Sequence, residues 1–552
     1  RGRSDGMARR TNRLLWIFGL IGFVLFIGFA IQDPSLRSEG ELNREQVLDK
    51  AVAFWQEQGV DVSDLEPKAT VETEQNADGY VGKYDLRDEL AKKMPTDAAL
   101  IYWQVVYADR ETGATYQVRI HPETGKVVGY ERDEAFDGNA FDRVQAEQVA
   151  VSELKKRGID PSKLLREKWM EEDLADNPVE TLSTFRDEGR WTFMYRVEDW
   201  ELRTMKYRYL VTVSGDQVSA VNTQFLVPRD FLQWHDRQQT IGMLLTGLSL
   251  LLSFVLFVLA LLFLFLLKQK KPFWSSLWLS LLVFVLFAFS NLEQLPLLQQ
   301  QLLTAGGEIG VTLGTTIVVV VVLIMALLIG AATYPMLLTG GMLVRLVKPS
   351  LWLSWRDMEW PERMRGAVWK GYLLAFAWLG FQGVFYWIAE EYFGVWYESD
   401  TSMSPVNAWV PLLFPLLAWL AGIQEEVTYR LFGVTFFKKY FKSSLVAVLI
   451  PAMIWALGHS LYPIYPIYTR FIELTIFGGV IGYCYLWLGI EAVILAHVIF
   501  DTIQMCIPML LSGEIVQIVS GVLFLLLPIA VGYGLSLVRP RRKLEPESFE
   551  IV

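Results

Sequence analysis

The stretch "WVPLLFPLLAWLAGIQEEVTYRLFG" (residues 409–433) joins a long apolar run to two adjacent glutamates near its end. An apolar run of about 18 or more residues is typical of a transmembrane helix. Carboxylates inside lipid are costly, so an intramembrane pair of them indicates a functional site by default. The stretch therefore predicts a membrane-embedded site that includes Glu425 and Glu426.

Apolar runs of similar length recur along the 552-residue chain, of which 53% is hydrophobic. They predict ten transmembrane helices, which we place at residues 14–31, 239–267, 273–292, 309–331, 370–389, 407–431, 445–461, 468–487, 490–511 and 514–537. The first follows "RRTNR" and lacks a small-residue cleavage site, so we predict a retained anchor. The preceding "RGRSDG" (1–6) is interpreted as a cloning scar. The expected fold class is an α-helical polytopic membrane protein.

Lysine and arginine clusters predict the orientation of these helices, because cytoplasmic loops are enriched in basic residues. The clusters that fall on the side where the chain starts are "KQKK" (268–271), "RLVK" (345–348), "KKYFK" (438–442) and "RPRRK" (539–543). We expect both termini in the cytoplasm, a cytoplasmic tail at 538–552, and a multi-pass location in a bacterial cell membrane. The Trp-rich basic segment 350–371 predicts an amphipathic helix on the cytoplasmic interface.

The polar insert at 33–237 is expected outside the cytoplasm. It carries 41 acidic and 27 basic residues, a net of −14 against −10 for the whole chain, which leaves +4 for the remainder. No basic patch lies in a soluble segment, so no nucleic-acid partner is expected. Cys484 and Cys506 both lie in predicted spans, so the insert holds no disulfide.

The insert contains a pattern that occurs twice. "EQVLDKAVAFWQEQGVDVSDL" (45–65) is similar to "EQVAVSELKKRGIDPSKL" (147–164), and each predicts an amphipathic helix ending near a glycine. Alternating strand-like runs follow each copy, which we place at 100–108, 115–122 and 126–131, and at 190–198, 208–214 and 217–224. The pattern predicts an extracytoplasmic α+β domain built of two repeated modules.

The run "YQVRIHPETGKVVGYE" (116–131) resembles the PepSY-type module, a small helix-plus-hairpin domain found beside bacterial membrane and secreted peptidases. The resemblance implies a module that inhibits or regulates a peptidase. The alternative is a generic binding or spacer domain.

Two of the four histidines lie in apolar spans. His459 and His497 can each be a buried structural histidine or part of a site. His121 and His235, in or beside the polar insert, are expected to be ordinary surface residues. Asp501 lies four residues after His497, so both face one side of their helix.

The glutamate pair is expected to divide its roles. Arg430 lies four residues after Glu426 and is predicted to neutralise it, which leaves Glu425 free for chemistry. Tyr429, four residues after Glu425, is predicted to donate a hydrogen bond to it. At about 1.5 Å per helical residue, Glu425, His459 and the later histidine with its aspartate fall within one broad layer of the membrane.

A carboxylate with histidines in a water-poor cavity suits hydrolysis, because the carboxylate can take a proton from water while imidazoles position it and stabilise an oxyanion. The predicted spans contain no GxSxG nucleophile motif and no HExxH zinc motif. Arg470 and Glu473 are expected to pair with each other, and Glu491 to begin the ninth span.

The three elements together resemble the CPBP intramembrane glutamic endopeptidases (Abi family), which include the type II CAAX prenyl proteases. The first motif, EExxxR, is present from Glu425 to Arg430; the second, FxxxH, is present from Trp455 to His459 with Trp in place of Phe; the third, Hxxx(N/D), runs from His497 to Asp501. The similarity covers roughly residues 370–537, the expected catalytic core, whereas spans two to four (239–331) are only loosely constrained by it.

The resemblance implies metal-free and cofactor-free hydrolysis of a peptide bond in a membrane-associated peptide or protein. Glu425 with His459 would activate water, and His497 with Asp501 would stabilise the oxyanion. Asp501 replaces asparagine, so it must be protonated or must orient the histidine. Trp455 would shape the cavity wall, and Glu426 with Arg430 would be structural.

Two other classes of function fit parts of the pattern. A catalytically silent scaffold of the same fold could modulate a membrane partner or confer bacteriocin immunity, and it would tolerate loss of Glu425. An ion or metal transporter could use two histidines and two carboxylates in one layer. Many transporters show broken helices in matching halves, and the sequence offers no such pair.

Overall fold

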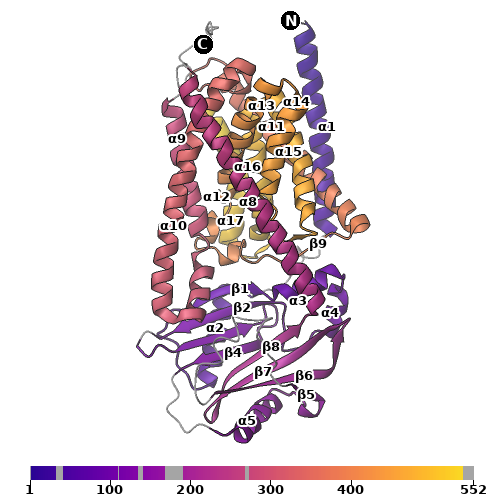
Figure 1. Cartoon of the computed structure of the whole chain (residues 1–552), viewed down its shortest axis with the longest axis vertical. Helices are drawn as coiled ribbons and strands as arrows, with labels where there is room; N and C mark the ends of the chain where they lie inside the picture. Colours follow the sequence, from indigo (N-terminus) through magenta and orange to yellow (C-terminus); the bar gives the residue numbers. More distant parts are fainter. Residues whose placement is uncertain are drawn as a thin grey trace.

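The computed structural model describes residues 2–32, 42–109, 111–134, 141–167, 190–267 and 273–538. It is mostly helical, with a long helical bundle at one end and an α+β region built from the early part of the chain at the other (Figure 1). The predicted basic clusters at 268–271 and 539–543, and all but one residue of the predicted tail at 538–552, lie outside the described residues.

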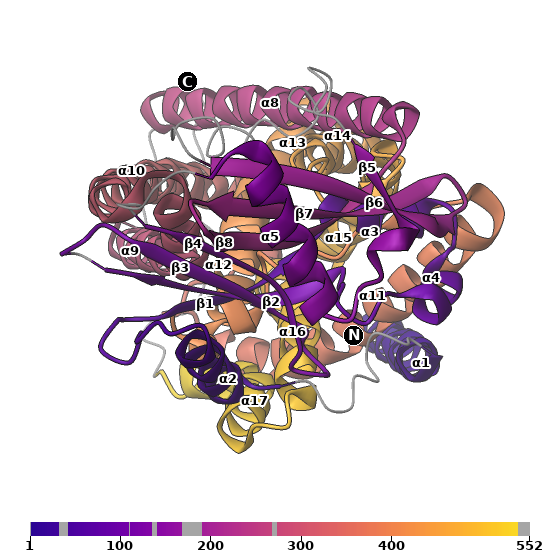
Figure 2. The same cartoon turned by 90° about the horizontal axis from the view of Figure 1, so that it is seen from below.

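The α+β region is organised around one antiparallel sheet of eight strands, in the order β1-β2-β3-β4-β8-β7-β6-β5. The strands are β1 (Lys68–Thr73), β2 (Ile101–Ala108), β3 (Thr115–Ile120), β4 (Val127–Asp133), β5 (Leu164–Glu167), β6 (Arg190–Leu202), β7 (Met205–Ser214) and β8 (Gln217–Leu226). The first four strands form one half and the last four the other, and β4 pairs with β8 through Tyr130 and Val221. The sheet spreads across the end of the helical bundle (Figure 2).

Each half of the sheet begins with a helix, α2 (Arg44–Glu57) in the first and α5 (Arg143–Lys156) in the second. Both helices start with a capping box, built on Asn43 and Asp142, which satisfies backbone N–H groups of the first turn. Both end in a glycine of positive φ, Gly59 and Gly158, as a Schellman C-terminus requires.

The backbone after these glycines closes in the same way in both halves. The N–H of Val60 donates to the carbonyl of Trp55, and the N–H of Ile159 donates to that of Leu154. This agreement of local geometry supports the prediction of a repeated module. The sequence patterns did not reveal β1, β5 or the two short helices of the first half, α3 (Gln75–Lys83) and α4 (Arg87–Lys93).

Eight helices among the described residues are long and apolar enough to cross a membrane. These segments lie in α1 (Gly2–Gln32), α8 (Arg229–Leu266), α9 (Phe273–Leu292), α10 (Leu295–Val347), α11 (Trp360–Phe393), α15 (Tyr468–Leu488), α16 (Ile490–Leu511) and α17 (Ile515–Ser536), and one of them, Trp274–Leu303, runs from α9 into the start of α10. Their exposed surfaces are rich in large apolar side chains, as expected of helices that face lipid.

The prediction of ten membrane helices is not confirmed, because two of the predicted spans differ in form. The predicted span 407–431 is irregular at its start, where Pro411 and Pro415 interrupt the chain, and becomes regular only at α12 (Leu416–Glu425). The predicted span 445–461 contains a shorter apolar helix, α14 (Ser444–Leu457).

The predicted amphipathic helix at 350–371 is wrong as a separate element. Its first part holds a single 3₁₀ turn, η3 (Pro349–Leu351), followed by irregular backbone, and its second part is the start of α11. Trp360 is buried rather than lying on an interface, and its indole N–H donates to the carbonyl of Leu535. α11 is a central helix: α1 packs along it so closely that Gly22 lies directly against Gly380.

The sheet is fastened to the bundle by side-chain hydrogen bonds to backbone. Asn407, buried in the loop before α12, accepts from the N–H of Val71 and donates to its carbonyl, as an added strand would. Asp78 of α3 accepts from the N–H of Ser399, 2.7 Å away. α8 then continues directly from β8 and crosses the bundle diagonally (Figure 1).

A buried polar cluster lies at this junction and corrects the prediction for His235. That histidine is 9% exposed, and its Nε2 lies 2.8 Å from Glu398 Oε1 and 3.0 Å from the Tyr465 hydroxyl. Glu398 follows the short strand β9 (Trp396–Tyr397), which pairs with β10 (Ile464–Tyr465). His121 instead accepts backbone N–H groups within the turn that follows β3.

Candidate active site

The glutamate pair lies where an α-helix changes into a π-helix. α12 ends at Glu425, and the π-helix η6 (Glu426–Val434) follows before the chain returns to α-helix in α13 (Thr435–Phe441). π-Helical segments are rare and are frequent at functional sites, because the extra residue in each turn re-aims side chains. η6 is almost wholly buried and contacts α10, α12 and α14, so its unusual geometry is held from several sides.

Glu425 lies between the two predicted histidines. Its Oε1 is 3.9 Å from His459 Nε2, and its Oε2 is 3.9 Å from His497 Nε2. His459 follows the end of α14, and His497 lies in the middle of α16. Three elements far apart in sequence thus bring together a carboxylate and two imidazoles at separations too long for direct hydrogen bonds.

The proton on His459 is placed by its other ring nitrogen. Nδ1 lies 2.9 Å from the carbonyl oxygen of Trp455, which can only accept, so Nδ1 carries the hydrogen. In the neutral ring Nε2 therefore presents a lone pair toward Glu425.

Glu426 and Arg430 form the predicted ion pair. Arg430 Nη1 lies 2.9 Å from Glu426 Oε1, and the two side chains are 1% and 0% exposed. The same glutamate oxygen lies 2.7 Å from His497 Nδ1, which the sequence did not predict. Glu426 therefore does more than neutralise the arginine: it also fixes the hydrogen of His497 on Nδ1 and directs Nε2 toward Glu425.

Asp501 lies one helical turn after His497 on α16, as predicted. Its Oδ2 is 3.4 Å from His497 Nε2, and its side chain is 23% exposed. At this distance the carboxyl group can orient the imidazole, which is one of the two roles predicted for it.

Trp455 and Tyr429 do not behave as predicted. The Trp455 indole N–H donates to Glu425 Oε2, so the residue is a direct partner of the glutamate rather than a wall of the cavity. Its ring also lies under the Arg430 guanidinium, 4.4 Å from the ring centroid. The Tyr429 hydroxyl is paired instead with Ser253 of α8, 2.9 Å away, because α8 crosses η6 at this level.

Two further buried ion pairs lie outside the cluster. Arg470 pairs with Glu473 at 2.6 Å, and Glu491 at the start of α16 pairs with Arg363 at 3.2 Å, as simple structural ion pairs. Within the described part of the chain, no group of three or more His, Cys, Asp or Glu side chains is arranged to hold a metal ion.

Comparison with known proteins finds a family match that covers the residues of this cluster. Residues 407–503 match the family described as type II CAAX prenyl endopeptidase Rce1-like. The family predicted from the three motifs is confirmed for this segment. It contains η6, α14 and most of α16, and hence every residue of the cluster described above.

A curated relative agrees with that result over a short range. The chain is 28% identical to the sporulation-killing factor biosynthesis protein SkfC of Bacillus subtilis (strain 168) over 89 residues, 16% of this chain and 18% of the relative. No solved structure matches the chain. The family match lies outside residues 33–237, so the PepSY-like resemblance stays a prediction.

Proposed function

We propose that this protein is an intramembrane endopeptidase that hydrolyses a peptide bond of a membrane-associated substrate with water activated by Glu425 and His459. The observation that carries the proposal is the 3.9 Å separation between Glu425 Oε1 and His459 Nε2. A water molecule about 2.8 Å from each atom fits such a separation. The family match over residues 407–503 supports a protease of this class.

The hydrogen positions explain how that water would be oriented. The carboxylate and the His459 Nε2 lone pair are both acceptors, so the water donates one hydrogen to each. Its lone pairs then point away from both groups and toward the substrate carbonyl. The Trp455 N–H holds the other carboxylate oxygen, which keeps Oε1 facing His459.

His497 is placed to stabilise the charge that develops on the carbonyl oxygen. Glu426 accepts from Nδ1, and in the imidazolium form of the ring Nε2 carries a second N–H that can donate to this oxygen, with Asp501 at 3.4 Å from Nε2. Arg430 balances the charge of Glu426. The four groups form a chain that orients one N–H beside the reacting atoms.

The reaction balances without a metal or cofactor. The water oxygen attacks the carbonyl carbon while its proton passes to Glu425, and the carbonyl π electrons move onto oxygen. The tetrahedral intermediate then collapses, the C–N bond breaks, and the proton on Glu425 passes to the leaving nitrogen. The products are a carboxylic acid and an amine.

The placement of the chain in the membrane is part of the proposal. The end of the bundle opposite the sheet carries Arg345, Lys348 and the basic residues after η6, which supports a cytoplasmic location for that end. The acidic α+β region would then lie outside, where it regulates the peptidase or recruits a substrate.

The test compares the wild-type chain with Glu425→Gln in native membranes and scores cut membrane peptides by terminal proteomics. Glutamine keeps the size of the side chain but cannot take the proton, so we expect specific fragments to fall by about 10² or more. They should persist with EDTA present and in the exposed control Glu391→Gln. Unchanged fragments with intact Glu425→Gln protein would reject the peptidase and leave the silent scaffold.

A further inference from the structure

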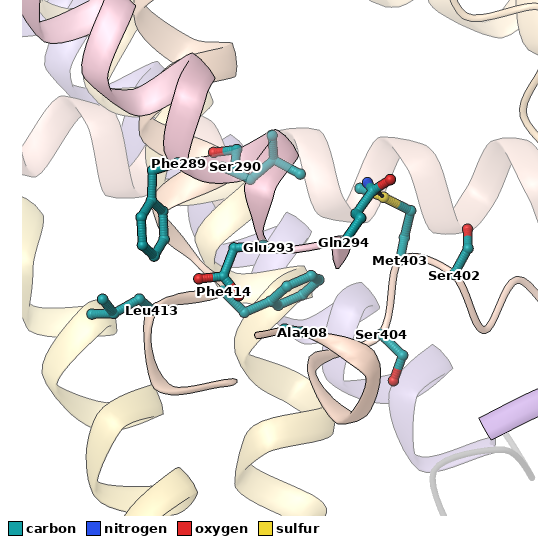
Figure 3. Close-up of a pocket in the computed structure, with 11 residues that line it drawn as sticks. Phe289, Ser290, Glu293, Gln294, Ser402, Met403, Ser404, Ala408, Leu413 and Phe414 are labelled. Atoms are coloured by element: carbon teal, nitrogen blue, oxygen red, sulfur yellow. Dashed lines mark hydrogen bonds between the residues drawn. The ribbon is translucent and has the colours of Figure 1, made fainter. Parts of the chain in front are cut away.

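A pocket lies apart from the glutamate–histidine cluster, between the end of α9 and the loop that leads into α12. Figure 3 shows Glu293 in the midst of the residues that line it. Phe289, Leu413, Phe414 and Leu417 form its apolar part, and Ser290, Ser402 and Ser404 contribute hydroxyl groups. None of the eleven lining residues is basic.

Glu293 is buried here with one oxygen used and one unused. It is 5% exposed, and its Oε2 accepts from the N–H of Val410 at 2.9 Å. Oε1 is buried and has no hydrogen-bond partner among the described residues. The hydroxyl of Ser290, one turn earlier on α9, is also buried and has no hydrogen-bond partner among the described residues. A buried carboxyl group is accommodated by donors, by a cation or by protonation, and these two oxygens are free to accept from a ligand with several donors.

We propose that this pocket binds the primary ammonium group of a lysine side chain of a peptide. An ammonium group has three donors, which match Glu293 Oε1, the Ser290 hydroxyl and one of the loop serine hydroxyls. The apolar side chains of the lining can contact the methylene groups of the lysine stem. A guanidinium has five donors in a rigid plane and would leave several of them unsatisfied.

The lining also discriminates between two sources of a primary ammonium group. An ethanolamine lipid headgroup carries a phosphate next to its ammonium group, and a buried phosphate needs basic partners. The eleven lining residues supply none. A lysine side chain carries no anionic group and therefore fits the observed lining better.

The pocket is connected to the proposed catalytic glutamate through α12. Leu417 lines the pocket, and Leu417, Ala421 and Glu425 follow one another at four-residue steps along one side of that helix. The axial distance is about 12 Å at 1.5 Å per residue. An extended peptide covers this distance in about four residues. This step rests on the proposed peptidase function. If that function holds, the peptide bond is expected to be cut about four residues from a lysine.

Binding is tested without reference to cleavage. The full chain in phosphatidylcholine nanodiscs is titrated with n-butylammonium, which copies the end of a lysine, and with n-butyltrimethylammonium, which has the same charge but no N–H donor. We expect saturable binding of the first, at least tenfold weaker binding of the second, and a tenfold loss in Glu293→Gln. Ser290→Ala should weaken binding, and the exposed control Glu391→Gln should not change it.

Several results would overturn the proposal. Equal binding of the two amines would show a nonspecific charge effect, and unchanged binding in Glu293→Gln would place the site elsewhere. Competition by phosphatidylethanolamine in the nanodisc would assign the pocket to a lipid headgroup. If Glu293→Gln does not fold, the two amines and Ser290→Ala still decide the matter. If n-butylammonium binds as expected but no peptide cleavage is detected, the pocket proposal holds and the proposed peptidase function fails.

Discussion

The molecule contains two buried clusters that join histidine to glutamate, and they differ in how closely the groups approach. At the junction with the sheet, His235 Nε2 lies 2.8 Å from Glu398 and 3.0 Å from Tyr465. In the bundle, both histidine Nε2 atoms stay 3.9 Å from Glu425. In the first cluster the histidine Nε2 makes a direct hydrogen bond to a tyrosine, whereas in the second the separations between Nε2 and the carboxylate are long enough for a water molecule to bridge them.

Exposure follows the same division for Glu425 and His459 but not for His497, whose side chain is 5% exposed. The Glu398 and His235 side chains are 6% and 11% exposed, against 18% for both Glu425 and His459. Direct hydrogen bonds between buried groups stabilise a fold, and separated groups within reach of a small molecule can carry chemistry. The comparison therefore teaches that spacing, rather than residue type, distinguishes a structural histidine from a candidate catalytic one.

The pair of substitutions His459→Gln and His235→Gln tests most directly whether the two histidines differ in role. We expect the first to reduce peptide cleavage by about 10²-fold with the midpoint of unfolding nearly unchanged, because the histidine positions the water. The second should lower the free energy of unfolding by about 1 to 2 kcal/mol and leave cleavage per folded molecule unchanged. Cleavage is scored by terminal proteomics and unfolding by detergent titration. Swapped phenotypes would contradict the comparison.

Removing the charge behind the cluster should act mainly on stability. Arg430→Met leaves the buried Glu426 with His497 as its remaining partner among the described residues, and breaking a buried ion pair in this way costs about 3 to 5 kcal/mol. Arg157→Met breaks a pair of the same i,i+4 spacing with both side chains less buried, and should cost about 1 kcal/mol or less. Equal losses in the two variants would show that Glu426 does not depend on the arginine.

Trp455→Phe tests the side-chain hydrogen bond that Glu425 makes among the described residues. Phenylalanine keeps an aromatic ring, and it is the usual residue of the motif, but it cannot donate to Oε2. We expect cleavage to fall about tenfold, equivalent to about 1.4 kcal/mol, with stability little changed. Trp419→Phe is the matched control, because that indole nitrogen on α12 has no hydrogen-bond partner among the described residues. An equal effect of both changes would remove Trp455 from the site.

The local part of this architecture could be predicted from sequence. Apolar length predicted most of the membrane helices, and four-residue spacing predicted the Glu426–Arg430 pair and the position of Asp501 beside His497. Glycines after two similar helices predicted their C-termini. Each of these features depends on residues close together in the chain, where periodicity and capping rules apply.

The parts that could not be predicted depend on contacts across the chain. Nothing near Trp455 indicates that its indole N–H reaches Glu425, and nothing near His235 indicates Glu398. The π-helix arises where several other elements pack round residues 426–434, and no local composition marks it. Asn407 likewise has no local sequence signal for its role, because that role depends on the position of β1 beside it. These features depend on packing between residues far apart in the chain, which no local sequence pattern reveals.

Glu72 of β1 provides a specific test of the junction between the sheet and the bundle, with the smallest expected effect. It accepts from Gln300 of α10 at 2.8 Å, and burial raises its pKa above the ordinary value of 4.5, an effect that nearby Arg119 opposes. A raised pKa means that the folded protein binds the proton more tightly than the unfolded chain does. The stabilisation is therefore present below the ordinary pKa and is lost as the pH rises through the raised one.

Glu72→Gln copies the protonated side chain and should remove that dependence. We expect the difference in free energy of unfolding between the variant and the wild type to be near zero in acid and to favour the variant increasingly as pH rises above the ordinary value of 4.5. Unfolding is followed by detergent titration over this range, with the exposed residue in Glu66→Gln as the control, which should run parallel to the wild type. Parallel curves for Glu72→Gln as well would mean that the carboxyl group is not desolvated where the sheet meets α10. The sheet would then be held by its neutral contacts, such as Asn407 with Val71, rather than by a titrating junction.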